Sequence, residues 1–289
     1  MAPSSAARRG RELATRVVSG LVLGPAVLAV VWIGGFPFFL LMLAVALLAA
    51  REWVRLVFAP AIRAEDDPSL ELSLGFLIAA LAVAQAVGPA AGLGVLAALT
   101  ILLFLVLSGR HEARRLMISL GVPYVGLAIL SMLWLRDLPS GDPAGEAAGD
   151  DGRALTFWLI LVIWATDIAA YAAGRTIGGP KLAPTVSPNK TWAGLFGAMV
   201  GAAAAGAGFG LAFGASAIWA AALLGAVLAV VAQTGDLLES AVKRRHGVKD
   251  SGSLIPGHGG ILDRIDGVIA AAPVLALFHA VIGRAIGWW

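Results

Sequence analysis

The sequence predicts an all-α polytopic membrane protein with about nine transmembrane helices. Of its 289 residues, 59% are hydrophobic and only 13% are charged, and the mean hydropathy of +0.88 exceeds what a soluble core requires. Apolar segments long enough to cross a bilayer recur along the chain. Most lysines and arginines fall in alternate loops between them. These observations exclude a soluble globular domain.

Nine segments are apolar over roughly the 17–25 residues that a membrane helix needs, although the second is short. Turn residues separate several of them, as in "GGFP" at 34–37 and "GPAAG" at 88–92. We expect the spans at 17–33, 36–50, 70–87, 89–107, 116–135, 155–174, 191–213, 216–235 and 265–283.

The distribution of basic residues predicts how the chain is oriented. If the N-terminus is cytoplasmic, only Arg136, Arg153 and Arg284 of the 21 lysines and arginines lie outside, in agreement with the positive-inside rule. We therefore expect a multi-pass protein of the inner (cytoplasmic) membrane, with a basic cytoplasmic N-terminus (1–16) and a single membrane domain (17–289). The same rule accounts for the pI near 9.7 without a nucleic-acid partner.

The chain has no cysteine and four scattered histidines. A disulfide framework and a thiolate metal site are therefore excluded, and a histidine cage is disfavoured. Any metal must take oxygen or nitrogen ligands. The tryptophans near span ends, among them Trp53 and Trp288, need only an interfacial explanation.

Carboxylates stand at the edges of the last two spans. Asp236 and Glu239 share one helical face, and Asp263 and Asp266 repeat the same spacing at the head of the last span. Two helices can thus direct paired carboxylates at a common point, an arrangement that suits Mg²⁺. The alternative is a set of salt bridges with Arg264 and the nearby lysines, and the spacing alone does not decide between the two.

Basic and glycine residues surround these carboxylates. Lys243, Arg244, Arg245 and Lys249 crowd one loop, which is also typical of a cytoplasmic flank. In "PGHGG", Gly257, Gly259 and Gly260 let the backbone approach a ligand, and the helix N-terminus that follows favours an anion. Basic side chains, carboxylates and a glycine-rich backbone together indicate a site for a metal-bound polyphosphate at the cytoplasmic edge of the membrane. His258 is either an acid–base group or an ordinary loop residue.

A second polar loop, 174–194, lies on the same predicted face. It carries Arg175, Lys181 and Lys190, with Ser187 and Thr191 ahead of a helix that begins near Thr191. An N-cap and a proline turn would explain the hydroxyl groups without any ligand, but they do not explain Lys190. Asp167, four residues before Tyr171 within the sixth span, is open to a catalytic role or to a buried hydrogen bond with that tyrosine.

The stretch "SAVKRRHGVKDSGSLIPGHGGILDRID", Ser240–Asp266, resembles the signature of the phosphatidate cytidylyltransferase (CDP-diacylglycerol synthase) family. Upstream, "DIAAYAAGR", "SPNKTW" and "GDLLES" are similar as well, so the resemblance covers about 167–267. The N-terminal spans share only hydropathy and "REW" at 51–53. Ala193 departs from the family, whose members usually carry Glu or Gln there, which leaves the role of this position open.

The resemblance implies transfer of a cytidylyl group from CTP to phosphatidic acid in the lipid bilayer, with a catalytic half at about 155–289. It implies Mg²⁺ at Asp236, Asp263 and Asp266, with Lys249 as a further catalytic residue. The remaining polar positions are expected to bind substrate: Asp167, Arg175, Ser187, Lys190, Lys243, Arg244, Asp250, His258, Gly259, Gly260 and Arg264. A second, monovalent cation and a homodimer stay open, and acyl-chain preference is not indicated.

Two other classes of protein fit parts of the pattern. A CDP-alcohol phosphotransferase also uses helical aspartates, but its Asp-Gly-x-x-Ala-Arg motif is absent from this sequence. An ion-coupled transporter predicts polar residues at the bilayer midplane and repeated halves. Here the polar residues gather at the cytoplasmic edge, and no internal repeat is evident.

Overall fold

The computed structural model describes residues 5–58, 67–109, 111–139, 151–252, 254 and 259–289, with side chains from Ser19 onward except that of Arg284. Its helices are α1 (Ser5–Ile33), α2 (Gly35–Phe58), α3 (Pro68–Val87), α4 (Pro89–Val106), α5 (Arg115–Arg136), α6 (Asp151–Thr176), α7 (Trp192–Phe213), α8 (Ile218–Arg245), α9 (Leu262–Phe278) and α10 (Arg284–Ile286). A π-helical turn, His279–Gly283, joins α9 to α10, and a hairpin of β1 (Lys181–Ala183) and β2 (Ser187–Thr191) precedes α7.

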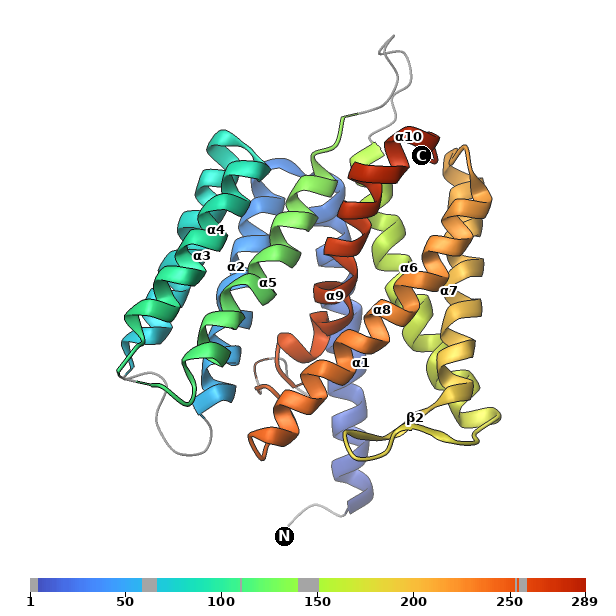
Figure 1. Ribbon diagram of the computed structural model, residues 1–289. Helices are drawn as coiled ribbons and strands as arrows, with labels where there is room; N and C mark the ends of the chain where they lie inside the picture. The colour runs from blue at the N-terminus through green and yellow to red at the C-terminus, as the bar shows by residue number, and fades with distance from the viewer. Residues whose placement is uncertain (1–4, 59–66, 110, 140–150, 253, 255–258) are drawn as a thin grey trace.

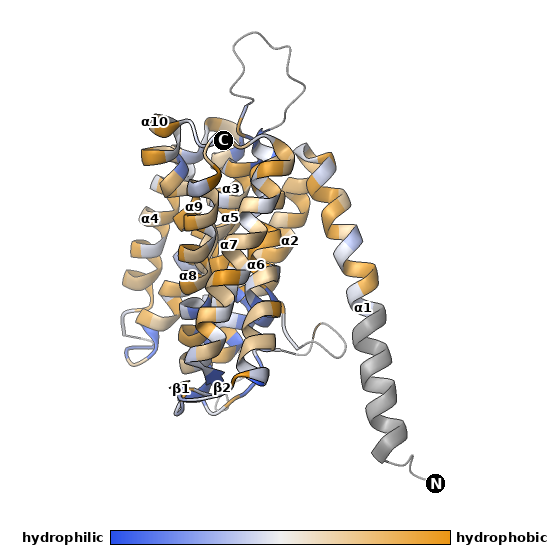
Figure 2. Ribbon diagram, turned by 90° about the vertical axis from the view of Figure 1, so that its right-hand side faces the viewer, coloured by the Kyte–Doolittle hydropathy of each residue, from blue (hydrophilic) through white to orange (hydrophobic). Residues whose placement is uncertain are grey.

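The long helices run up and down beside one another, so the loops alternate between two ends of the bundle (Figure 1). Eight of the described helices are long and apolar enough to cross a membrane, and the apolar part of α1, Ser19–Ile33, is shorter. Hydrophobic residues dominate the length of the helices, whereas hydrophilic ones gather at the end that carries the hairpin (Figure 2). The predicted all-α polytopic fold is confirmed, with the small hairpin as its one addition among the described residues.

Two helices continue well beyond their predicted ends. The second span was expected to end at residue 50 and the eighth at 235, but α2 reaches Phe58 and α8 reaches Arg245. Hydropathy marks where a helix leaves the apolar layer, and nothing in these polar stretches stops a helix there. Lys243, Arg244 and Arg245 therefore form the last turn of α8 and not a loop, so that prediction was wrong.

Two of the three basic residues expected outside hold the first helix in place. The guanidinium of Arg136 is buried and donates hydrogen bonds to the carbonyls of Val31 (2.8 Å) and Trp32 (3.2 Å) at the end of α1. Arg153 lies over the ring of Trp32, 4.4 Å from its centroid. Cations at a helix C-terminus satisfy carbonyls that have no helical partner. These residues are therefore structural exceptions to the positive-inside pattern.

The tryptophans correct a second prediction. Trp53 is only 5% exposed and Trp288 is fully buried, so neither lies in an interfacial belt. The indole of Trp53 donates a hydrogen bond to the carbonyl of Met117 (2.7 Å), and its ring packs on Tyr124. A buried indole needs such an acceptor. Trp53 thus fixes α2 against α5 next to the polar end of the bundle.

Candidate functional site

Carboxylates from three helices meet near the hydrophilic end of the bundle. Asp266 at the start of α9 lies within electrostatic range of Asp236 and Glu239 on α8 and of Asp167 on α6. Like charges within this range repel one another. Carboxylates of α6, α8 and α9 thus lie within electrostatic range of one another.

Lysine side chains neutralise part of this acidic cluster. The ammonium of Lys190 on β2 lies 2.6 Å from a carboxylate oxygen of Asp236, and Ser240 donates a hydrogen bond to the other oxygen (3.2 Å). The Lys190 and Asp236 side chains are 17% and 33% exposed. This pair is therefore accessible, and an incoming anion or cation can compete for either partner.

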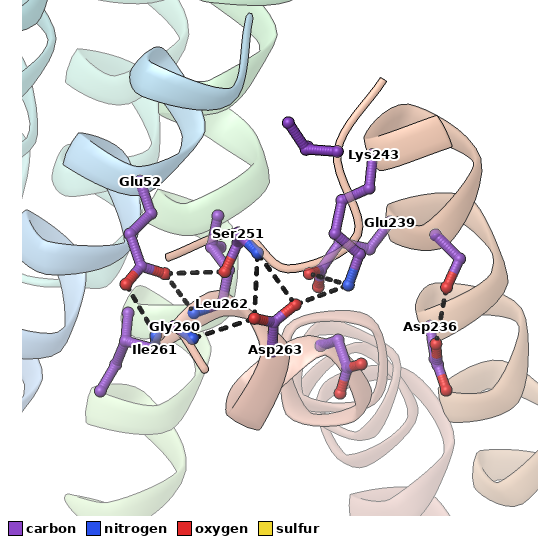
Figure 3. A network of polar contacts seen from close by, with 12 residues as sticks. Glu52, Asp236, Glu239, Lys243, Ser251, Gly260, Ile261, Leu262 and Asp263 are labelled. Atoms are coloured by element: carbon purple, nitrogen blue, oxygen red, sulfur yellow. Dashed lines mark hydrogen bonds and ion pairs between the residues drawn. The ribbon is translucent and has the colours of Figure 1, made fainter. Parts of the chain in front are cut away.

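Lys243 makes a second and much more buried ion pair. Its ammonium contacts Asp263 at 2.6 Å and Glu239 at 3.0 Å, and the Glu239 side chain is fully buried. Figure 3 shows the ammonium of Lys243 between these two carboxylates. The prediction that Lys243 binds substrate is not supported by this geometry, because both partners are internal. Here the salt-bridge alternative describes the structure better.

Three donors already bind the carboxylate of Asp263. Besides Lys243, it accepts hydrogen bonds from the backbone N–H groups of Ser251 (3.0 Å) and Gly260 (2.9 Å). A carboxylate has about four acceptor positions, so little capacity is left for a metal. Among the described residues, no three acidic or histidine side chains converge on one metal position. The structure thus does not assemble the expected trio of Asp236, Asp263 and Asp266.

The charge of the cluster nevertheless fits a divalent cation. The interacting residues are five carboxylates, Asp167, Asp236, Glu239, Asp263 and Asp266, and three cationic side chains, Lys190, Lys243 and Arg264. The carboxylates outnumber the cationic side chains by two, an excess that a bound cation would reduce. Asp236 is part-exposed, and Asp266 accepts a described hydrogen bond only from its neighbour Gly267. These two carboxylates fit a metal, and Asp263 as arranged here does not.

The helix N-terminus that was expected to hold a substrate anion holds a side chain of the protein. The carboxylate of Glu52 on α2 accepts hydrogen bonds from the backbone N–H groups of Ile261 and Leu262, both at 2.9 Å. A Cβ at Gly260 would collide with Glu52 and Ser251, and a Cβ at Gly259 would lie 2.8 Å from Asp263. The assignment of these two glycines to substrate binding stays a prediction, and the structure gives them a second role. They make room for carboxylates from within the fold.

The remaining predicted residues lie at the surface or outside the described chain. Arg175 donates a hydrogen bond to the exposed hydroxyl of Tyr171 (2.6 Å), which replaces the expected Asp167–Tyr171 contact. Thr191 caps α7 as predicted, accepting from the N–H of Gly194 (3.0 Å). Several predicted side chains are exposed or half-buried: Asp167, Ser187, Arg244, Lys249, Asp250 and Arg264. His258 lies outside the described residues.

Two residues of the N-terminal half that interact with residues of the C-terminal half were not identified from the sequence. Glu52 is 5% exposed and bonds to residues about 200 positions away along the chain. Tyr124 on α5 lies within electrostatic range of Glu239, Asp266 and Asp236. Contacts over such separations leave no periodic signal in a sequence. The only hint was the "REW" at 51–53, which contains Glu52.

The fold and the site together define a polytopic membrane protein in which acidic and basic side chains interact near one end of the helix bundle. A family model described as "Cytidylyltransferase family" matches residues 14–282. The chain therefore belongs to the cytidylyltransferase family.

Relatives with a common printed name agree with this assignment. A phosphatidate cytidylyltransferase of Brucella suis biovar 1 (strain 1330) is 37% identical over 94% of this chain and 95% of its own length. The enzymes so named from Mycobacterium leprae (strain TN) and Staphylococcus haemolyticus (strain JCSC1435) are 40% and 41% identical over 43% and 45% of this chain. Full-length similarity thus extends the resemblance beyond residues 167–267.

Proposed function

We propose that this protein is a phosphatidate cytidylyltransferase. A phosphate oxygen of phosphatidic acid attacks the α-phosphorus of CTP, the bond to the β-phosphate breaks, and CDP-diacylglycerol and pyrophosphate result. The observation that supports this best is the cluster of Asp236, Asp266 and Lys190 at one end of a membrane-spanning bundle. The lipid phosphate is already an anionic nucleophile, so the site must mainly neutralise charge and position the two substrates.

The part-exposed basic residues are suited to bind phosphate groups, and the acidic residues are suited to bind a cation. Lys190 and Arg264 flank the carboxylates, since both interact with Asp167, and they are suited to bind the phosphates of CTP and of the lipid. Lys249 and Arg244 are exposed and add positive charge at and just beyond the C-terminal end of α8. Lys243 is occupied by Glu239 and Asp263, and it sets the position of α9 relative to α8.

Mg²⁺ is the cofactor that this donor set fits, with Asp236 and Asp266 as its ligands. When bound, it would neutralise the charge that develops between the α- and β-phosphates. Asp263 binds the N–H groups of Ser251 and Gly260 and so helps to fix the start of α9, the helix that carries Asp266. We place the protein in the inner membrane with the N-terminus and this cluster facing the cytoplasm, where CTP is found.

Purified protein should transfer label from CTP to a lipid only when phosphatidic acid and Mg²⁺ are both present. Diacylglycerol should not replace phosphatidic acid because it lacks the phosphate nucleophile. The measurement is radioactivity in the lipid phase after incubation with α-labelled CTP, with release of pyrophosphate followed in parallel. Equal labelling with diacylglycerol would rule out the proposed reaction.

The orientation can be tested with single cysteines, because the natural chain has none. Thr185 lies between β1 and β2, and Ser216 lies between α7 and α8 at the opposite end of the bundle; both are exposed. In intact spheroplasts, a membrane-impermeant thiol reagent should label Ser216→Cys, and it should label Thr185→Cys only after permeabilisation. The reverse pattern would place the acidic cluster outside the cell.

A further inference from the structure

A carboxylate of the N-terminal half holds the start of the helix that carries Asp266. Glu52 accepts a hydrogen bond from the hydroxyl of Ser251 (3.0 Å) in addition to those from the Ile261 and Leu262 N–H groups. Figure 3 shows its carboxylate reaching across to the loop and the first residues of α9. The first N–H groups of a helix have no helical partner, and a carboxylate is their strongest acceptor.

Gly252 and Gly260 leave room for this side chain. A Cβ at Gly252 would lie 2.6 Å from one carboxylate oxygen of Glu52, and a Cβ at Gly260 would collide with the other. The neighbouring N–H groups of Ser251 and Gly260 donate hydrogen bonds to Asp263. Glu52 of α2 and Asp263 of α9 therefore both bind Ser251 and residues at or just before the start of α9.

We infer that Glu52 is a positioning residue for the carboxylate of Asp266: by accepting two hydrogen bonds from the start of α9 and one from the Ser251 hydroxyl, it fixes the start of this helix, and with it the direction in which Asp266 faces Asp236. This rests on the proposed metal site, and it assigns the N-terminal half a part in the reaction. Glu52 touches no substrate and acts only through α9. Residues that orient metal ligands in this way are commonly worth 10–100-fold in metal affinity.

Glu52→Gln tests the inference because glutamine keeps the size of the side chain but replaces one acceptor oxygen with an NH₂ group that faces N–H donors. Hydrogen exchange followed by mass spectrometry should show the Ile261 and Leu262 amides exchanging about tenfold faster than in the wild type. Calorimetry should show Mg²⁺ binding weakened about tenfold or more. In the labelling assay, kcat should fall more than the KM for CTP rises.

Two further variants keep the test decisive. Glu71→Gln makes the same chemical change at an exposed position on α3 and should leave exchange, Mg²⁺ binding and kcat as in the wild type. Ser251→Ala removes one of the three donors and keeps the Glu52 carboxylate, so it should change amide exchange, Mg²⁺ affinity and kcat in the same direction but by less. This variant carries the test if Glu52→Gln does not fold.

The outcomes separate this inference from the proposed function. If Glu52→Gln exchanges faster but binds Mg²⁺ as tightly as the wild type, Glu52 is a purely structural residue and the inference is overturned. Unchanged amide exchange in Glu52→Gln would overturn it too, and so would a wild type that binds no Mg²⁺. A wild type that binds Mg²⁺ and loses affinity in Glu52→Gln, yet labels no lipid, would support the inference and refute the proposed reaction.

Discussion

Asp266→Asn should lower kcat by about a hundredfold or more while leaving yield and thermal stability near those of the wild type. One oriented charge at a phosphoryl-transfer site is commonly worth about 3 kcal/mol in the transition state. The folded state should not suffer, because Asp266 faces Asp236, Glu239 and Asp167 and makes its described hydrogen bond to the adjacent Gly267 N–H. Removing one of several mutually repelling charges relieves repulsion.

The measurement is the rate of lipid labelling per folded protein, beside a thermal unfolding curve in the same detergent. Glu71→Gln, an exposed acid far from the cluster in sequence, is the control for loss of one negative charge. Substantial residual turnover would remove Asp266 from the metal site. A large fall in unfolding temperature would show that Asp266 stabilises the fold, contrary to the repulsion argument.

The three aspartates that looked equivalent in sequence are expected to behave differently. Asp236→Asn also breaks the contact with Lys190, which is part-exposed and so contributes little to stability. Asp263→Asn removes the charge that pairs with Lys243 and replaces one of the two acceptor oxygens with an NH₂ group that faces N–H donors, so it should cost stability as well as activity. Sequence spacing alone could not separate these roles, because spacing gives the face of a helix and not the partners opposite it.

The spans were predictable because burial in a bilayer demands long apolar segments. The predicted helix starts at Pro89 and near Thr191 were close for a local reason, since a proline and a cap mark the entry to each helix. The ends of α2 and α8 were missed because polar residues continue a helix as readily as apolar ones do. Local signals thus predict where helices begin, and hydropathy marks only where the membrane ends.

The types of residue at the site could be predicted from the sequence, but the contacts between them could not. The acids, bases and glycines were recognised, but their partners within the chain were not: Lys243 pairs with Glu239 and Asp263, and the Gly260 N–H donates to Asp263. In addition, Glu52 occupies the helix N-terminus from about 200 residues away. An anion-binding motif read from sequence does not reveal whether its anion is a ligand or a distant carboxylate of the same chain.

Lys243→Met should destabilise the protein by about 3–5 kcal/mol, the usual cost of removing one partner from a buried ion pair. Methionine fills a similar volume but leaves the buried Glu239 carboxylate without its cation and removes the shortest contact of Asp263. Glu239 already has one oxygen with no hydrogen-bond partner in the described part of the chain, so its charge would lose all described compensation. Thermal or denaturant unfolding in detergent measures the loss.

Two companion variants decide what Lys243 does. Arg245→Met changes an exposed base on the same turn of α8 and should alter the free energy of unfolding by no more than about 0.5 kcal/mol. Lys243→Met combined with Glu239→Leu should recover much of the lost stability, because Asp263 keeps its two backbone donors while the stranded buried charge is gone. If Lys243→Met instead kept the wild-type unfolding temperature and raised only the KM for CTP, the lysine would be a phosphate ligand, as its place in the sequence first indicated.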